Sequence, residues 1–243
     1  MAGPIPQILA YSLLPTAAMA SGGAIAAWRK PTPKLRSAIL HFAAGVVFSV
    51  VAVELLPDVV RDHAPVQVVI GFAFGVAAML AIRALSRRAE KAGTDKSPAN
   101  LPLGLLAGVG VDIAIDGLLL GIGFAAGAKE GVLLTLALTV EVLSLGLATA
   151  TALGEAGLPR VKAARVVATL SLLFFAGAAA GATLLRQLSG HALEIVLSFG
   201  LAALLFLVTE ELLVEAHEEE ETAWLTAAFF AGFLLFLILG IVS

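Results

Sequence analysis

Apolar residues run along this chain in long blocks, separated by short stretches that hold most of its charged residues and prolines. Crossing the hydrocarbon core of a bilayer takes ~20 helical residues, and blocks of that length are typical of transmembrane helices. Eight such blocks lie at roughly 5–28, 37–57, 66–82, 101–127, 131–153, 166–185, 195–214 and 223–243. We therefore expect an all-α polytopic membrane protein that forms one domain over residues 1–243.

The composition supports a lipid environment. The chain is 60% hydrophobic and 14% charged, against about 45–50% and about 25% in soluble domains. The net charge of −3 gives no basic footprint for nucleic acid, so the expected partner is the lipid bilayer. No cysteine is present, which rules out disulfides and thiolate metal ligands within the chain. The stretch 86–100 has the composition of a flexible linker.

The basic residues predict the orientation of the spans. Three alternate loops hold 12 of the 15 Lys and Arg residues, namely Arg29, Lys30, Lys34, Arg36, Arg83, Arg87, Arg88, Lys91, Lys96, Arg160, Lys162 and Arg165. The opposite side has Arg61, Lys129 and Arg186. Because cytoplasmic loops are enriched in Lys and Arg, we expect both termini outside and the protein in a bacterial inner (plasma) membrane.

Three acidic residues fall near the middle of adjacent spans. Asp112 and Asp116 share one face of span 101–127, a turn apart, and Glu141 lies in span 131–153. A rise of 1.5 Å per residue places Asp112 and Glu141 ~15 Å deep, near the midplane of a ~30 Å core. The connection between the two spans is short, so they are antiparallel neighbours and their acids can converge.

No basic residue lies in either of these spans to neutralise the acids. Three carboxylates cannot all stay ionised at low dielectric without a partner. They bind a cation, or they hold protons and bond to neighbouring helices. The physical argument favours a cation site. By contrast, Glu54, Asp58 and Glu215 lie near predicted span ends, where we expect acids to be solvated.

Short internal matches predict an inverted repeat. The acid of "DIAIDG" in span 101–127 and that of "EVLSLG" in span 131–153 both precede a glycine by five residues. "ELLPD" in span 37–57 matches "ELLVE" in span 195–214. The members of each pair cross the membrane in opposite directions, as in inverted-topology transporters with a midplane site.

The chain resembles the ZIP (Zrt/Irt-like) metal-ion transporters over all eight spans. "MASGGAIAA" and "HFAAGVVFSVVAVELLPD" look like the opening helices of that family, "SLLFFAGAAAG" fits its helix 6 pattern, and "EELLVEAH" fits its helix 7 motif. The resemblance implies a ZIP-like bundle that transports zinc, manganese or iron by alternating access, within a homodimer and without a resident cofactor.

The sequence departs from the family at the metal site. The family's helix 4 histidine and glutamate positions are Asp112 and Asp116 here, and its first helix 5 ligand position is Glu141. The second carboxylate position of helix 5 is Leu145. Ligands of a second metal would match Ile113, Val142 and Phe174, so that second site should be absent. The helix prolines become Ile115, Ser144 and Phe175, which makes kinks unfavoured in these three spans.

The expected metal site therefore comprises Asp112, Asp116 and Glu141, with Ser144 or water completing it. All these ligands are oxygen atoms, which suit Mn²⁺ or Mg²⁺ better than zinc. The resemblance also implies that spans 1, 4, 5 and 6 carry the site and slide against the others. The ion would leave through a cytoplasmic release path formed by Glu210, Glu211, Glu215 and His217.

Two other functions compete with metal transport. An intramembrane aspartyl protease needs two aspartates on different helices that share a proton, whereas Asp112 and Asp116 share one helix; we expect no enzyme. The alternative is a proton- or sodium-coupled carrier of another substrate, on a ZIP-like scaffold that lost metal binding. Metal binding at Asp112, Asp116 and Glu141 separates this carrier from a metal transporter.

Overall fold

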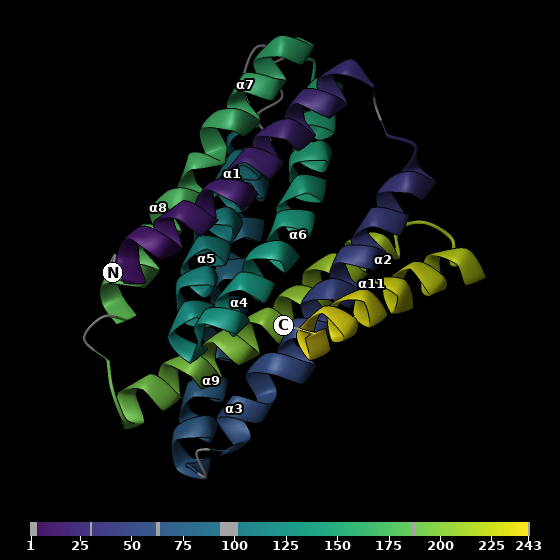
Figure 1. Cartoon of the computed structure of the whole chain (residues 1–243). Coiled ribbons are helices and arrows are strands. Elements are labelled where there is room, and N and C mark those ends of the chain that lie inside the picture. The colour runs from purple at the N-terminus through teal and green to yellow at the C-terminus, as the bar shows by residue number, and fades with distance from the viewer. Residues whose placement is uncertain (1–3, 30, 62–63, 93–101, 186–187, 243) are drawn as a thin grey trace.

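The computed structural model describes residues 4–29, 31–61, 64–92, 102–185 and 188–242, and Figure 1 traces the whole chain. The described residues contain eight helical spans long and apolar enough to cross a membrane, so the predicted all-α polytopic fold is confirmed. The elements are α1 (Pro4–Trp28), α2 (Pro33–Val50), η1 (Val51–Leu55), α3 (Leu56–Arg61), α4 (Pro65–Ala92), α5 (Leu103–Ala126), α6 (Ala128–Glu155), α7 (Arg160–Leu170), α8 (Leu172–Leu185), α9 (His191–Phe206), η2 (Leu207–Leu212), α10 (Leu213–Ala216) and α11 (Ala223–Val242).

Three of the spans are built from more than one element. The second span joins α2, η1 and α3, and the seventh joins α9, η2 and α10; η1 and η2 are π-helical. In η1 the Leu56 N–H donates to the Val51 carbonyl, five residues back. Pro57 follows directly, and its missing N–H removes an α-helical bond, which favours the wider turn. The sixth span joins α7 and α8.

Two sequence expectations are corrected by these elements. The third span was expected to end at residue 82, but α4 continues to Ala92, so residues 86–92 are helical and Arg83 lies inside the helix. Lys30, Lys96, Arg186 and linker residues 93–100 lie outside the described residues. α5 and α6 are continuous α-helices, but the sixth span, in which no kink was expected, is interrupted at Ser171. There the Phe174 N–H donates three residues back to the Ser171 carbonyl.

The spans associate in two groups. One group holds α1, α5, α6 and α7–α8, and the other holds α2, α4, α9 and α11. Figure 1 shows α2 and α11 side by side, away from α1 and α7. The groups meet mainly where α5 contacts α4 and α9, and where α2 contacts α6.

Glycines bring the backbones together inside each group. A Cβ atom at these positions would collide with a carbonyl of the adjacent helix, so only glycine permits the observed spacing. The glycine–carbonyl pairs are Gly22–Leu143 and Gly146–Met19, Gly117–Phe174, Gly177–Ala114 and Gly181–Leu118, Gly45–Phe229 and Gly232–Phe42, and Gly71–Ile195 and Gly75–Phe199. All nine join helices of the same group. They pack the backbones of four helix pairs closely, namely α1·α6 and α5·α8 in one group and α2·α11 and α4·α9 in the other.

These contacts have the symmetry that an inverted repeat predicts. The close pairs α1·α6 and α2·α11 correspond to α8·α5 and α9·α4. The correspondence extends to single residues: Gly232 packs on the Phe42 carbonyl and Gly75 on that of Phe199. Phe42 precedes Phe199, and Gly75 precedes Gly232, by the same number of residues. The second and seventh spans are therefore equivalent, as are the third and eighth.

Candidate metal centre

The three central acids meet between α5 and α6. Asp112 and Asp116 lie four residues apart in α5, which places them on one face. Only Gly127 separates the end of α5 from the start of α6, so the two helices pack as an antiparallel pair and bring Glu141 opposite that face. One carboxylate oxygen from each of the three residues lies within 4.8 Å of the others. The structure thus brings together the three residues that the sequence predicted as ligands.

Two of these acids have no access to water. Asp116 is 1% exposed and Glu141 is 2% exposed. Asp116 Oδ2 and Glu141 Oε2 are buried and have no hydrogen-bond partner. Leaving such a group unpaired costs about 1–3 kcal/mol, and more when it is charged. Like charges at this distance also repel strongly at low dielectric. A cation bound between the three carboxylates removes both penalties.

Ser144 lies next to the acids on the same helix. It is buried, and its hydroxyl donates a hydrogen bond of 2.6 Å to the Glu141 carbonyl. Its proton is therefore used by the backbone, while the hydroxyl oxygen keeps acceptor capacity. Ser144 remains a predicted fourth ligand.

The positions that the resemblance to ZIP transporters assigns to ligands of a second metal are apolar and buried. Ile113, Val142 and Phe174 are all 0% exposed. Gly117 lets α5 lie against the backbone of α8 at Phe174. The surroundings offer no further polar ligand from these three positions and keep the local dielectric low.

A pocket of about 280 Å³ reaches Asp112 from the side of the bundle that carries the basic loops, hereafter the basic side. Its lining includes Arg83, Asp112, Glu211 and Glu215. The carboxyl groups of Asp112, from α5, and Glu211, from η2, are neighbours on the wall of this pocket. Asp112 is thus the member of the centre that faces the pocket, and Glu211 is the first acid beyond it.

Of the other residues predicted for the release path, Glu215 lines this pocket, Glu210 contacts the lining residue Arg83, and His217 is not among the lining residues. Glu210 forms an ion pair with Arg83, and Glu215 forms one with Arg36. His217 Nε2 lies 2.7 Å from Glu221. Arg36 and Arg83 were both expected in loops. Their ion pairs with acids of the seventh span have no signal in the sequence, because opposite charges far apart along the chain form no local pattern.

Glu54 was predicted to be solvated near a span end, and this prediction is wrong. The second span continues to Arg61, so Glu54 lies inside it with a side chain only 10% exposed. Its carboxylate forms an ion pair of 3.3 Å with Lys129 at the start of α6. The repeat of "ELLPD" in "ELLVE" was a usable signal, because it pairs Glu54 with Glu211.

Comparison with known proteins adds no assignment to this geometry: no protein-family model matches the chain, and neither does any curated protein.

Proposed function

We propose that this protein carries divalent metal cations across a membrane, through a single carboxylate site formed by Asp112, Asp116 and Glu141. One observation supports this most directly. Three carboxylates meet within 4.8 Å in the interior of an integral membrane protein, and two of them have buried oxygens without a partner. Acids inside a membrane mark ion or proton pathways, and a divalent cation best balances several carboxylates.

The pocket gives such an ion a way in or out. It opens on the basic side and ends at Asp112. We propose that the ion passes Glu211, Glu215, Glu210 and His217 on this side. On the orientation expected from the basic loops, this is the cytoplasmic release path.

The ligand chemistry limits the substrate class. Asp112, Asp116, Glu141 and Ser144 supply only oxygen, which suits Mn²⁺ and other hard divalent ions better than Zn²⁺. The resemblance to ZIP transporters favours zinc, manganese or iron. Mn²⁺ satisfies both arguments and is the metal to test first.

The two helix groups fit alternating access. The glycine-mediated contacts lie within each group, so we propose that each moves as a unit and that side chains slide at the boundary between them. The site belongs to the group of α1, α5, α6 and α7–α8. As in the family that the chain resembles, we propose that two copies form a homodimer in a bacterial inner membrane, with both termini outside.

One observation favours the alternative, a proton- or sodium-coupled carrier of another substrate. Asp112 and Glu211 are adjacent carboxyl groups beside the site, and adjacent acids can share a proton, which a proton-coupled carrier would use. Such a carrier needs no metal at Asp116 and Glu141, so metal binding decides between the two proposals.

The experiment measures accumulation of Mn²⁺, Zn²⁺, Fe²⁺, Co²⁺ and Cd²⁺ in cells that express the protein, together with binding to purified protein. Asp116→Ala with Glu141→Ala should abolish both uptake and binding. Glu155→Gln, which alters an exposed acid at the end of α6, is the matched control and should behave as wild type. Wild-type uptake by the double variant would refute the proposed site.

A further inference from the structure

Glu54 and Glu211 occupy equivalent places in the repeat. Each lies in a π-helical segment and is followed by two leucines. The Leu56 N–H donates to the Val51 carbonyl, and the Leu213 N–H donates likewise to the Val208 carbonyl. The sequence interval from Glu54 to Glu211 is the same as that from Phe42 to Phe199, whose carbonyls pack on equivalent glycines.

The two acids nevertheless have different partners. Glu211 lies beside Asp112 and lines the pocket that reaches the site. Glu54 is held by Lys129, whose ammonium group also donates a hydrogen bond of 2.6 Å to the Gly240 carbonyl. Lys129 therefore ties the start of α6, in one helix group, to η1 and α11 in the other.

Glu54 is also far from Glu141, the residue that corresponds to Asp112 in the repeat. In the repeat, α5 is equivalent to α6, and Asp112 is therefore equivalent to Glu141. Each of these acids lies five residues before a tightly packed glycine, Gly117 for Asp112 and Gly146 for Glu141. A Cβ atom on Gly240 would lie near both Glu54 and Leu133, so Glu54 is level with Leu133 on α6. Eight residues of helix separate Leu133 from Glu141, a rise of about 12 Å.

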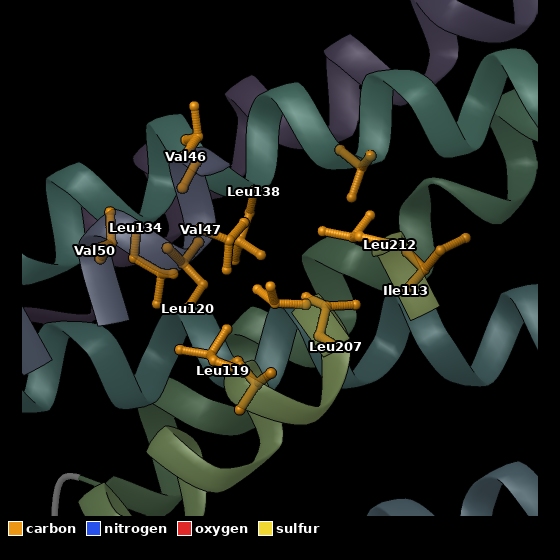
Figure 2. Close-up of a cluster of buried hydrophobic side chains, with 14 of the residues drawn as sticks. Val46, Val47, Val50, Ile113, Leu119, Leu120, Leu134, Leu138, Leu207 and Leu212 are labelled. Carbon is orange, nitrogen blue, oxygen red and sulfur yellow. The ribbon is translucent and has the colours of Figure 1, made fainter. Parts of the chain in front are cut away.

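Apolar side chains fill the space between these two levels. Val46, Val47 and Val50 from α2 and Leu134 and Leu138 from α6 are each at most 1% exposed. Figure 2 shows Val47, Val50, Leu134 and Leu138 packed together with Leu120 of α5. The site is thus reached by a pocket on the basic side and sealed by a dry layer on the Lys129 side.

We propose that the Lys129–Glu54 ion pair is a latch that keeps the Lys129 side shut, and that its opening lets Glu54 approach Glu141 as Glu211 approaches Asp112 here. This inference rests on the proposed carrier function, since a carrier must open one site to both sides in turn. Lys129 is 39% exposed, and partly hydrated ion pairs are weak enough to break reversibly. If the equivalent helices of the repeat exchange their conformations, the chain adopts a second arrangement in which the Lys129 side is open and the basic side is closed.

The first test uses thiol accessibility, because the native chain has no cysteine. Val47→Cys places one reporter in the apolar layer, and a membrane-impermeant maleimide is applied to vesicles of both orientations. With Lys129 intact, labelling from the Lys129 side should stay at background. Lys129→Met should raise it several-fold, whereas Lys162→Met, a lysine on the basic side, should not. Background labelling in both Lys129→Met and Glu54→Gln would overturn the latch.

The second test measures the proposed approach itself. Asp112→Cys with Glu211→Cys is the positive control and should be bridged by a short bifunctional thiol reagent. Glu54→Cys with Glu141→Cys removes the latch and should also be bridged. Bridging of the control pair alone would overturn the proposal. Neither test uses metal, so a failed latch leaves the uptake result standing, and absent metal uptake leaves the accessibility result standing.

Discussion

Asp116 and Glu141 lie on different antiparallel helices, yet their carboxylates face each other across less than 4.8 Å of buried space, and each keeps one oxygen without a partner. These two buried acids destabilise the protein locally, and a cation bound between them would relieve that destabilisation. This relationship gives a stability readout for the site that does not depend on transport.

Asp116→Asn and Glu141→Gln should each weaken metal binding and each stabilise the metal-free protein. Each removes a ligand charge, so Mn²⁺ affinity should fall by at least about tenfold, the lower range for a lost supporting contact at metal sites. Each also replaces a buried acid, which either repels its neighbours or takes up a proton, with a neutral amide, so the metal-free variant should unfold at a higher temperature. Calorimetric titration and thermal unfolding in detergent measure the two effects. A lower unfolding midpoint for both metal-free variants would contradict the repulsion argument.

Metal affinity should rise with pH. Carboxylates bind metal in the ionised form, so protons compete with the ion and metal binding releases them. Affinity is therefore weakest in acid and increases as the site loses its protons. Titration in two buffers of different ionisation enthalpy counts the released protons. Asp116→Asn should release fewer, whereas Glu155→Gln should match wild type. An affinity independent of pH would mean that no site carboxyl holds a proton without metal.

One ion should bind per chain. Ile113, Val142 and Phe174 are fully buried apolar side chains, and none of them can ligate a second metal. Elemental analysis of protein equilibrated with excess Mn²⁺ should give one metal per chain. An anomalous-scattering map with two peaks about 4 Å apart, the spacing of paired-metal sites, would disprove this prediction.

Gly146→Val should destabilise the bundle, because a Cβ at Gly146 would collide with the Met19 carbonyl of α1. Forced overpacking costs about 1–3 kcal/mol, seen as a lower unfolding midpoint. Gly154→Ala on the same helix is the control, since a Cβ there has no neighbour within 4 Å. It should leave the midpoint unchanged or raise it, because alanine favours helix. Equal effects of the two substitutions would show that the α1–α6 contact is not tight.

The two ends of α6 should lie on opposite sides of the membrane. Ala128 and Ala156 flank this helix and are both exposed, so Ala128→Cys and Ala156→Cys are single reporters. The distribution of Lys and Arg predicts that an impermeant thiol reagent labels Ala128→Cys in intact cells and Ala156→Cys only after permeabilisation. The reverse pattern would invert the proposed orientation.

The sequence predicted the spans and the three central acids because both depend on local patterns. A sufficiently long apolar run crosses a bilayer as a helix, because the backbone polar groups must then be hydrogen-bonded within the segment itself. Asp112 and Asp116 share a face through helical spacing alone, and the short link at Gly127 leaves Glu141 little choice of position. These predictions needed no knowledge of distant contacts.

Other features depended on contacts between distant segments. Arg83 was placed in a loop because hydropathy falls before it, whereas its pairing with Glu210 and its position over the Phe206 ring hold it in a longer helix. Glu54 was expected in water because nothing near it in the sequence reveals Lys129. The break at Ser171 was not expected, because kinks were predicted from proline and the sixth span has no proline there.

The π-helical segments add one residue to a helical turn, as an inserted residue would. Deleting a single residue from Val51–Leu55 would restore the α-helical phase of the second span. Everything on one side of the deletion would then turn by about 100° and move by about 1.5 Å relative to the other side. The same edit in Leu207–Leu212 would turn α10, at the basic-side end of the seventh span, relative to α9. One residue in each segment thus sets the angular position of a short span end, Leu56–Arg61 in one span and Leu213–Ala216 in the other.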